Sequence, residues 1–133
     1  MNPTIFVIFG ATGDLARKKI LPSFFELYKN KLLPEKFKII AASRSPFSTE
    51  EFLEILKETA PKNREGWENF TKTIEYFQCD IERDINIDKL TPLLDKKEVE
   101  FDQCAQRIFY MAISPFIYES AFDTIGRHNP VSY

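Results

Sequence analysis

The segment TIFVIFGATGDLARKK, residues 4–19, decides the fold. Its continuous apolar run, residues 5–9, predicts a strand that is buried on both faces. Gly10 and Gly13 interrupt the run, and a basic segment that favours helix follows at once. A parallel strand that turns through glycines into a helix leaves backbone N–H groups without partners, where the helix dipole favours negative charge. The segment therefore predicts an anion-binding turn.

The small residues of this turn follow the spacing G-x-x-G-x-x-A, a variant of the dinucleotide fingerprint G-x-G-x-x-G. We expect Gly10 to adopt a tight turn, Gly13 to let a pyrophosphate approach the backbone, and Ala16 to let the helix pack closely on the strand. The prediction is a dinucleotide site at this turn. The alternative is a glycine turn that only connects a strand to a helix.

Size and composition limit the possible classes of protein. The chain has 133 residues, enough for one domain with one core, and its formal net charge of −2 gives no reason to expect nucleic-acid binding. The first apolar run is too short for a signal peptide or a membrane span, so no membrane contact is expected. Cys79 and Cys104 fit no metal-ligand spacing and suggest no disulfide, which favours a protein without a metal site in a reducing cytoplasm.

Strand and helix signals alternate along the rest of the chain. Strands are expected at residues 4–9, 37–42, 74–78 and 107–113. Helices are expected at residues 14–30, 48–59, 64–71, 88–97 and 116–127. Pro22 predicts a kink or a late start in the first helix, and Ser48 with Glu51 forms a capping-box pattern. The alternation predicts an α/β fold, a Rossmann-like doubly wound parallel sheet of about four strands with helices on both faces.

The end of the second expected strand bears on the choice of dinucleotide. NAD sites place an acid there for the ribose 2′-hydroxyl, whereas NADP sites place an arginine for the 2′-phosphate. This chain has no acid at that point, and Arg44 lies between Ser43 and Ser45. A guanidinium pairs with phosphate oxygens through two parallel hydrogen bonds, so the pattern favours NADP, with Ser43 as an additional donor. The alternative is that Arg44 only begins a solvated loop.

The spacing of this arginine is unusual. Arg44 lies 31 positions after Gly13, whereas the specificity residue usually follows the glycines by about 20 positions. The long first helix and the loop at Pro34 account for the excess. Near the turn, we expect Arg17 to lie close to the phosphates, and we assign Asp14 to capping and loop geometry.

Several segments together resemble the N-terminal part of the glucose-6-phosphate dehydrogenase family. They are FGATGDLARKK at residues 9–19, LLP at 32–34, ASRS at 42–45 and FYMAISPFIYE at 109–119. The turn with its basic tail is specific to that family, and the pattern Y-x-A-x-x-P-x-x-Y-E in the last segment supports the resemblance independently. The resemblance extends from about Thr4 to Asn129.

The resemblance implies NADP-dependent oxidation of glucose 6-phosphate to 6-phosphogluconolactone, the first step of the pentose phosphate pathway. The family residues that contact the cofactor phosphates match Gly10, Ala11, Thr12, Gly13, Asp14, Leu15, Ala16 and Arg17. The arginine that binds the 2′-phosphate matches Arg44, Ala112 lies beside the nicotinamide half, and Tyr118 belongs to the cofactor site. Tyr118 has an alternative role as an apolar-face residue of the last helix. Ser114 departs from the proline common at its position.

The family's substrate residues have no match in these 133 residues. These are the lysine of a Glu-Lys-Pro motif and a histidine-containing segment that supplies the catalytic base; His128 does not match it. We therefore expect an NADP-binding fragment over residues 1–129, inactive by itself, with an unstructured tail at 130–133. The last strand is then an uncovered edge that promotes self-association, so the sheet is incomplete there. Glucose 6-phosphate binding and homo-oligomer formation are expected of the full-length family member.

Two other classes of protein remain open from the residues alone. An atypical short-chain reductase-like protein also uses G-x-x-G-x-x-[GA], but such enzymes usually carry a Tyr-x-x-x-Lys pair. None of the five tyrosines is followed by lysine four positions later. The second alternative is a non-enzymatic module that binds NADP.

Overall fold

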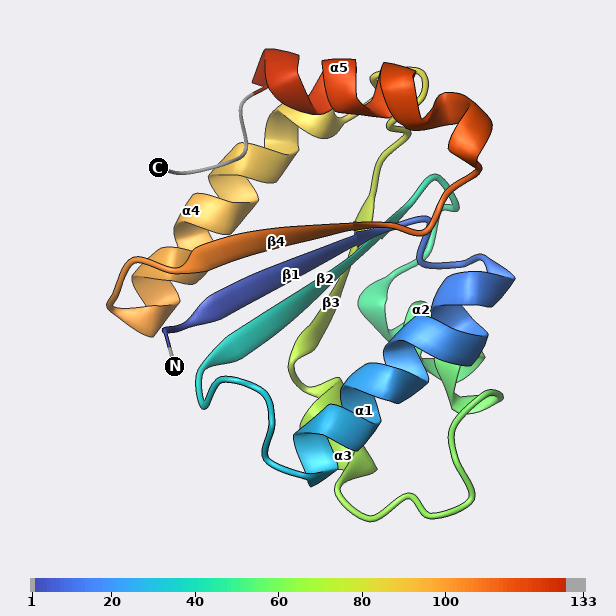
Figure 1. Ribbon diagram of the computed structural model, residues 1–133, viewed down its shortest axis with the longest axis vertical. Coiled ribbons are helices and arrows are strands. Elements are labelled where there is room, and N and C mark those ends of the chain that lie inside the picture. The colour runs from blue at the N-terminus through green and yellow to red at the C-terminus, as the bar shows by residue number, and fades with distance from the viewer. Residues whose placement is uncertain (1, 129–133) are drawn as a thin grey trace.

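The computed structural model describes residues 2–128 and contains one parallel sheet (Figure 1). Its strands are β1 (Thr4–Phe9), β2 (Phe37–Ser43), β3 (Ile74–Gln78) and β4 (Gln106–Met111). They lie in the order β3-β2-β1-β4, and every neighbouring pair is parallel. This arrangement confirms the predicted Rossmann-like α/β fold.

Helices cover both faces of the sheet (Figure 1). One face carries η1 (Ala16–Ile20), α1 (Leu21–Lys29), α2 (Thr49–Lys57) and α3 (Trp67–Thr71). The other face carries η2 (Ile87–Lys89), α4 (Leu90–Phe101) and α5 (Tyr118–His128), which follows the short turn η3 (Pro115–Ile117). Two hydrophobic cores result, one on each side of the sheet.

Strand β1 contributes to both cores because alternate side chains of a strand point to opposite faces. Phe6 and Ile8 pack in the core beside α1, whereas Ile5, Val7 and Phe9 pack in the core beside α4. All six residues of β1 are buried. The continuous apolar run therefore formed the doubly covered strand that it predicted.

The first helix differs from the continuous segment expected at residues 14–30. The helix begins at Asp14, a π-helical turn occupies Ala16–Ile20, and regular α-helix resumes at Leu21, with Pro22 in the first positions of α1. Proline lacks an N–H and its ring crowds the preceding turn, so a regular α-helix does not run through it unchanged. The wider π turn accommodates this change in hydrogen bonding. The expected late start is therefore wrong, because helical backbone already begins at Asp14 and the effect of Pro22 is a change of helix type.

Several other boundaries also shift. Helix α4 continues to Phe101, beyond the expected end at residue 97, and it tolerates Pro92 because that residue lies in its first turn, where a missing N–H costs no hydrogen bond. Helix α3 is shorter than the expected 64–71, β4 ends at Met111 rather than 113, and a 3-10 turn precedes α5. The Ser48 capping box is present as predicted. The expected tail at 130–133 lies outside the described residues.

Strand β4 forms an edge of the sheet in the described part of the chain, where it pairs only with β1. Its Ile108 and Tyr110 side chains are 37% and 38% exposed on the α1 face. This matches the expected open edge. Across residues 2–128, no helix combines the length and apolar character needed to cross a bilayer.

Candidate dinucleotide-binding site

A cavity of about 350 Å³ lies at the carboxyl ends of the strands. The chain turns to opposite sides of the sheet after β1 and β4, and such a switch point is where ligands bind in open parallel sheets. The cavity is lined by Phe9, Gly10, Thr12, Gly13, Ala42, Ser43, Arg44, Cys79, Asp80, Ile81, Glu82, Ala112, Ile113, Ser114 and Ile117. Of the predicted site residues, Gly10, Thr12, Gly13, Ser43, Arg44 and Ala112 therefore share one wall.

Gly10 makes the closest backbone contact of the site. Its φ is +80°, and a Cβ at this position would lie 2.1 Å from the carbonyl oxygen of Ala112. The Gly10 and Ala11 N–H groups both donate to the carbonyl of Ala42, at 2.9 and 3.1 Å. Only glycine fits here, because both the left-handed conformation and the space exclude a side chain.

The remainder of the turn is held by short contacts. The Gly13 N–H donates to the Gly10 carbonyl at 3.0 Å, and the Thr12 hydroxyl lies 2.7 Å from the Ser43 hydroxyl. The Thr12–Ser43 hydrogen bond connects the turn to the end of β2. The Arg17 N–H, in the first turns of the following helix, donates to the Gly13 carbonyl at 3.1 Å. The helix therefore begins immediately after the turn, with its N-terminal end at the cavity.

Arg44 follows β2 and is exposed at the edge of the cavity. Its carbonyl accepts a hydrogen bond from the Gln78 amide at 3.3 Å, which fixes the backbone there. Within residues 2–128, no ion pair engages its guanidinium. The charged group is therefore available to an anion in the cavity.

Arg17 does not line the cavity, although it was expected near the phosphates. Its Nε donates to the Thr12 carbonyl at 2.9 Å, and its guanidinium lies 3.2 Å from Asp14. Asp14 also pairs with Lys18 at 3.7 Å. Arg17 thus holds the turn through the Thr12 carbonyl, and the Asp14 carboxylate pairs with Arg17 and Lys18, so its expected role in capping stays a prediction.

The other predicted residues are placed around the cavity rather than in its wall. Ala11 and Ala16 are fully buried beneath the turn, and the Leu15 side chain is 51% exposed. Tyr118 lies on α5, where its hydroxyl donates to the Met111 carbonyl at 3.4 Å. This hydrogen bond connects α5 to the end of β4. Tyr118 is not among the residues that line the cavity.

The third strand supplies cavity residues that the sequence analysis missed. Cys79, Asp80, Ile81 and Glu82 follow β3 directly, and Ile113 and Ile117 follow β4. A signal was present, because parallel strands end at the same edge of a sheet and the residues after β3 had to lie beside Ser43 and Arg44. Burial raises the pKa of the Cys79 thiol to about 12, and the nearby Asp80 charge adds to this shift. The thiol is therefore protonated at neutral pH and is not a nucleophile.

No group of three or more His, Cys, Asp or Glu side chains within the described residues is arranged to hold a metal ion. The cavity wall also holds the Arg44 guanidinium and the Thr12 and Ser43 hydroxyls, which are groups that can bind an anion. The parallel sheet, the glycine turn at its switch point and the arginine after β2 place the chain in the Rossmann-like class of dinucleotide-binding domains.

Comparison with known families agrees with this class. The family model described as "Glucose-6-phosphate dehydrogenase, NAD binding domain" matches residues 7–132. The chain therefore belongs to the glucose-6-phosphate dehydrogenase family, in its NAD-binding domain. This result decides against the alternative of a short-chain reductase-like protein.

Individual relatives extend the same result. Glucose-6-phosphate 1-dehydrogenase of Aspergillus niger is 31% identical over 96% of this chain and 26% of its own length. The Bacillus subtilis enzyme is 30% identical over 91% of this chain and 25% of its own length. A solved structure, glucose-6-phosphate dehydrogenase in complex with its substrate glucose-6-phosphate, has a TM-score of 0.86 at 28% identity over 94% of this chain and 27% of that chain. The chain spans about a quarter of the length of the relatives it matches.

Proposed function

We propose that this chain is the NADP-binding domain of a glucose-6-phosphate dehydrogenase. The single observation that carries the proposal is the cavity at the switch point, whose lining brings together the glycine turn, Arg44 and Ala112. A pyrophosphate fits in this cavity because the helix that follows the turn presents its N-terminal end there, where first-turn N–H groups and the helix dipole favour negative charge. The family match agrees with a nicotinamide dinucleotide as the ligand.

Each element of the site has a role in this proposal. The turn at Gly10 and Gly13 binds the pyrophosphate, and the Thr12–Ser43 hydrogen bond holds that turn in position. Arg44, whose guanidinium has no ion-pair partner among the described residues, binds the 2′-phosphate of the adenosine ribose. Ala112 and Ser114 form the wall beside the nicotinamide half. NADP, when bound, supplies the acceptor for the hydride that leaves the sugar.

The activity of the longer relatives is part of the same proposal. We infer that this domain, within a full-length cytoplasmic homo-oligomer, serves the oxidation of glucose 6-phosphate to its lactone. A positioned base is needed to take the proton of the sugar hydroxyl. Among the described residues that line the cavity, the Cys79 thiol is held neutral with its pKa raised to about 12, and the Asp80 carboxylate accepts two N–H groups of its own loop and shares a wall with Arg44, on the proposed adenosine side. The 133-residue chain mixed with NADP and glucose 6-phosphate should therefore bind nucleotide without turnover.

The test of the proposal is a calorimetric titration of the 133-residue chain with NADP and with NAD. The chain should bind NADP more tightly, and Arg44→Ala should weaken NADP binding by roughly tenfold to a hundredfold, the range of a lost charged hydrogen bond. NAD affinity should not change in that variant. Arg64→Ala is the matched control, because Arg64 is exposed beside α3, away from the cavity. Equal affinity for both nucleotides, or NADP binding unchanged by Arg44→Ala, would overturn the assignment.

A further inference from the structure

A second cavity, of about 400 Å³, adjoins the dinucleotide site on the side of β3. Arg44, Cys79 and Asp80 line both cavities, so the two cavities adjoin at these residues. The second cavity adds Gln78, Arg83, Ile85 and Asn86 to its wall. Two guanidinium groups, from Arg44 after β2 and from Arg83 in the loop after β3, therefore face the same space.

The loop that carries Arg83 is closed at its base. Asp80 and Ile85 form a backbone bridge, with N–H to carbonyl distances of 2.9 Å in both directions. The Asp80 carboxylate also accepts the N–H groups of Glu82 and Arg83, each at 3.1 Å. We call residues 80–85 the β3 clip. These hydrogen bonds fix the backbone of the loop at Arg83.

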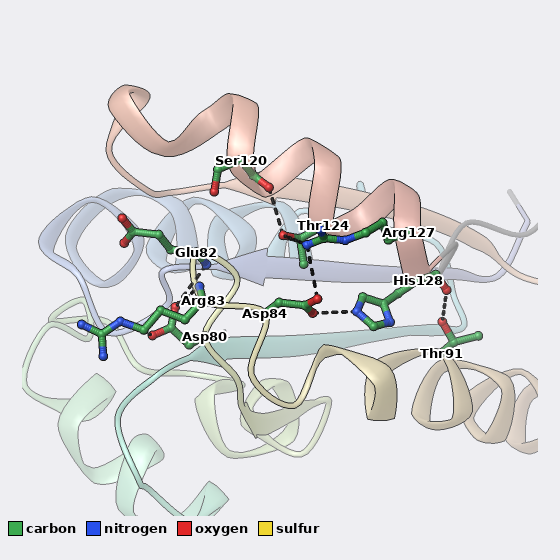
Figure 2. A network of polar contacts seen from close by, with 9 residues as sticks. All are labelled: Asp80, Glu82, Arg83, Asp84, Thr91, Ser120, Thr124, Arg127 and His128. Carbon is green, nitrogen blue, oxygen red and sulfur yellow. Dashed lines mark hydrogen bonds and ion pairs between the residues drawn. The ribbon is translucent and has the colours of Figure 1, made fainter.

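Helix α5 holds the β3 clip from the other side (Figure 2). Asp84 accepts a hydrogen bond from the His128 ring at 2.6 Å and pairs with Arg127 at 3.2 Å. Figure 2 shows Asp84 pointing toward these two residues, whereas Arg83 extends in the opposite direction, beside Asp80. The β3 clip is thus attached to α5 through Asp84, and the Arg83 side chain lies on the side of the clip that faces away from α5.

The Arg83 guanidinium is only loosely engaged. Its side chain is 74% exposed, and its ion pair with Asp80 is long, 3.9 Å, to a carboxylate oxygen other than the one that accepts the loop N–H groups. A pair this long and exposed contributes little energy. With Arg44 and Arg83 against the single carboxylate of Asp80, the wall of the second cavity has a net positive charge. Such a wall favours a dianionic phosphate monoester, whose three outer oxygens can pair with two guanidiniums at once.

We propose that Arg83 is a second specificity-determining residue for the ribose 2′-phosphate, which it binds from the β3 clip while Arg44 binds it from the end of β2. This inference rests on the proposed function, because it assumes that NADP occupies the first cavity. It predicts that the preference for NADP over NAD is shared between two arginines. The sequence analysis predicted the role of Arg44. Arg83 is brought to the site by the loop that the bridge between Asp80 and Ile85 closes.

The test compares Arg83→Gln with the matched control Arg64→Gln in titrations of the 133-residue chain with NADP and NAD. Arg83→Gln should raise the dissociation constant for NADP by about tenfold, the value expected for one charge-assisted hydrogen bond to phosphate, and leave that for NAD unchanged. Arg83→Lys should give an intermediate loss, because it keeps the charge without the two parallel hydrogen bonds. Added salt should narrow the difference between wild type and Arg83→Gln.

Each result has a separate meaning. If Arg83→Gln and the Arg64→Gln control have the same dissociation constant for NADP, the proposal for Arg83 is wrong. The proposed function still stands in that case, provided that the wild-type chain prefers NADP. If Arg83→Gln weakens both nucleotides equally, Arg83 is only structural and the inference is also overturned. If wild type binds neither nucleotide, or both equally, the proposed function fails first and the inference fails with it.

Discussion

The backbone of Gly10 packs directly against the carbonyl of Ala112, so that a Cβ on Gly10 would lie 2.1 Å from that oxygen. The contact joins the end of β1 to the segment after β4, residues about a hundred positions apart in the chain. It also sets the depth of the cavity at the switch point, because both residues line it. The geometry of the site therefore depends on glycine at position 10, where no side chain fits.

Gly10→Ala should destabilise the chain by more than about 2 kcal/mol, since it combines a strained left-handed alanine with a clash against backbone. The measurement is the free energy of unfolding in urea. Gly126→Ala is the control, because nothing lies within 4 Å of a Cβ there and the residue is in α5. That control should be neutral or stabilising, by up to about 1 kcal/mol. Similar effects of the two substitutions would contradict the role given to Gly10.

Thr12→Val should lower stability by about 1 kcal/mol, because it removes the 2.7 Å hydrogen bond to Ser43 and leaves a buried hydroxyl without that partner. We expect NADP and NAD affinities to fall by the same factor, since the substitution loosens the pyrophosphate turn and leaves Arg44 in place. Fluorescence titration measures both. Thr71→Val is the control, because its hydroxyl bonds only to the Glu68 carbonyl within α3. A selective loss of NADP affinity in Thr12→Val would contradict this account.

The two cysteines should differ in reactivity. Cys104 is exposed, whereas Cys79 is 4% exposed. At neutral pH a thiol-specific reagent should therefore modify one thiol quickly in the folded chain and the second only on unfolding. Modification of both thiols at the same rate in the native protein would show that Cys79 is not buried as described.

Alkaline pH should destabilise the fold through the same buried thiol. Burial raises the pKa of Cys79 from the ordinary 9.0 to about 12, so the unfolded chain releases this proton first. The stabilisation is complete below pH 9 and is lost as the pH rises toward 12. Burial also raises the pKa of Tyr76, which contributes in the same direction. Cys79→Ala should reduce, without abolishing, the fall in melting temperature between pH 9 and 11.

The exposed edge of β4 should cause self-association of the 133-residue chain. An edge strand with unpaired backbone groups and the half-exposed Ile108 and Tyr110 side chains is a template for pairing with another copy. Ile108→Lys should shift the sedimentation profile toward monomer, because a charge at the edge opposes strand addition. Val99→Lys is the control, since Val99 is 77% exposed on helix α4 and is not part of the edge strand. A wild-type chain that stays monomeric at high concentration and melts sharply and reversibly would contradict the prediction.

Local patterns were sufficient for much of the fold. The apolar run at residues 5–9 predicted a doubly buried strand, and the pair of Ser48 and Glu51 predicted the start of the helix that Ser48 caps. Arg44 was identified because the end of a strand follows directly from the sequence pattern. The π turn before Leu21 was not predicted, because it depends on how the first helix accommodates Pro22 while Ala16 stays buried against the sheet.

By itself, the sequence determined the alternation of strands and helices, the position of the glycine turn and the candidate arginine, since each follows from interactions among residues close together in the chain. Only the tertiary structure decided that Gly10 meets Ala112, that Thr12 bonds to Ser43 and that Arg83 shares a cavity with Arg44. The physical reason is that these contacts join different strand ends, and parallel pairing in the order β3-β2-β1-β4 alone brings those ends to one edge.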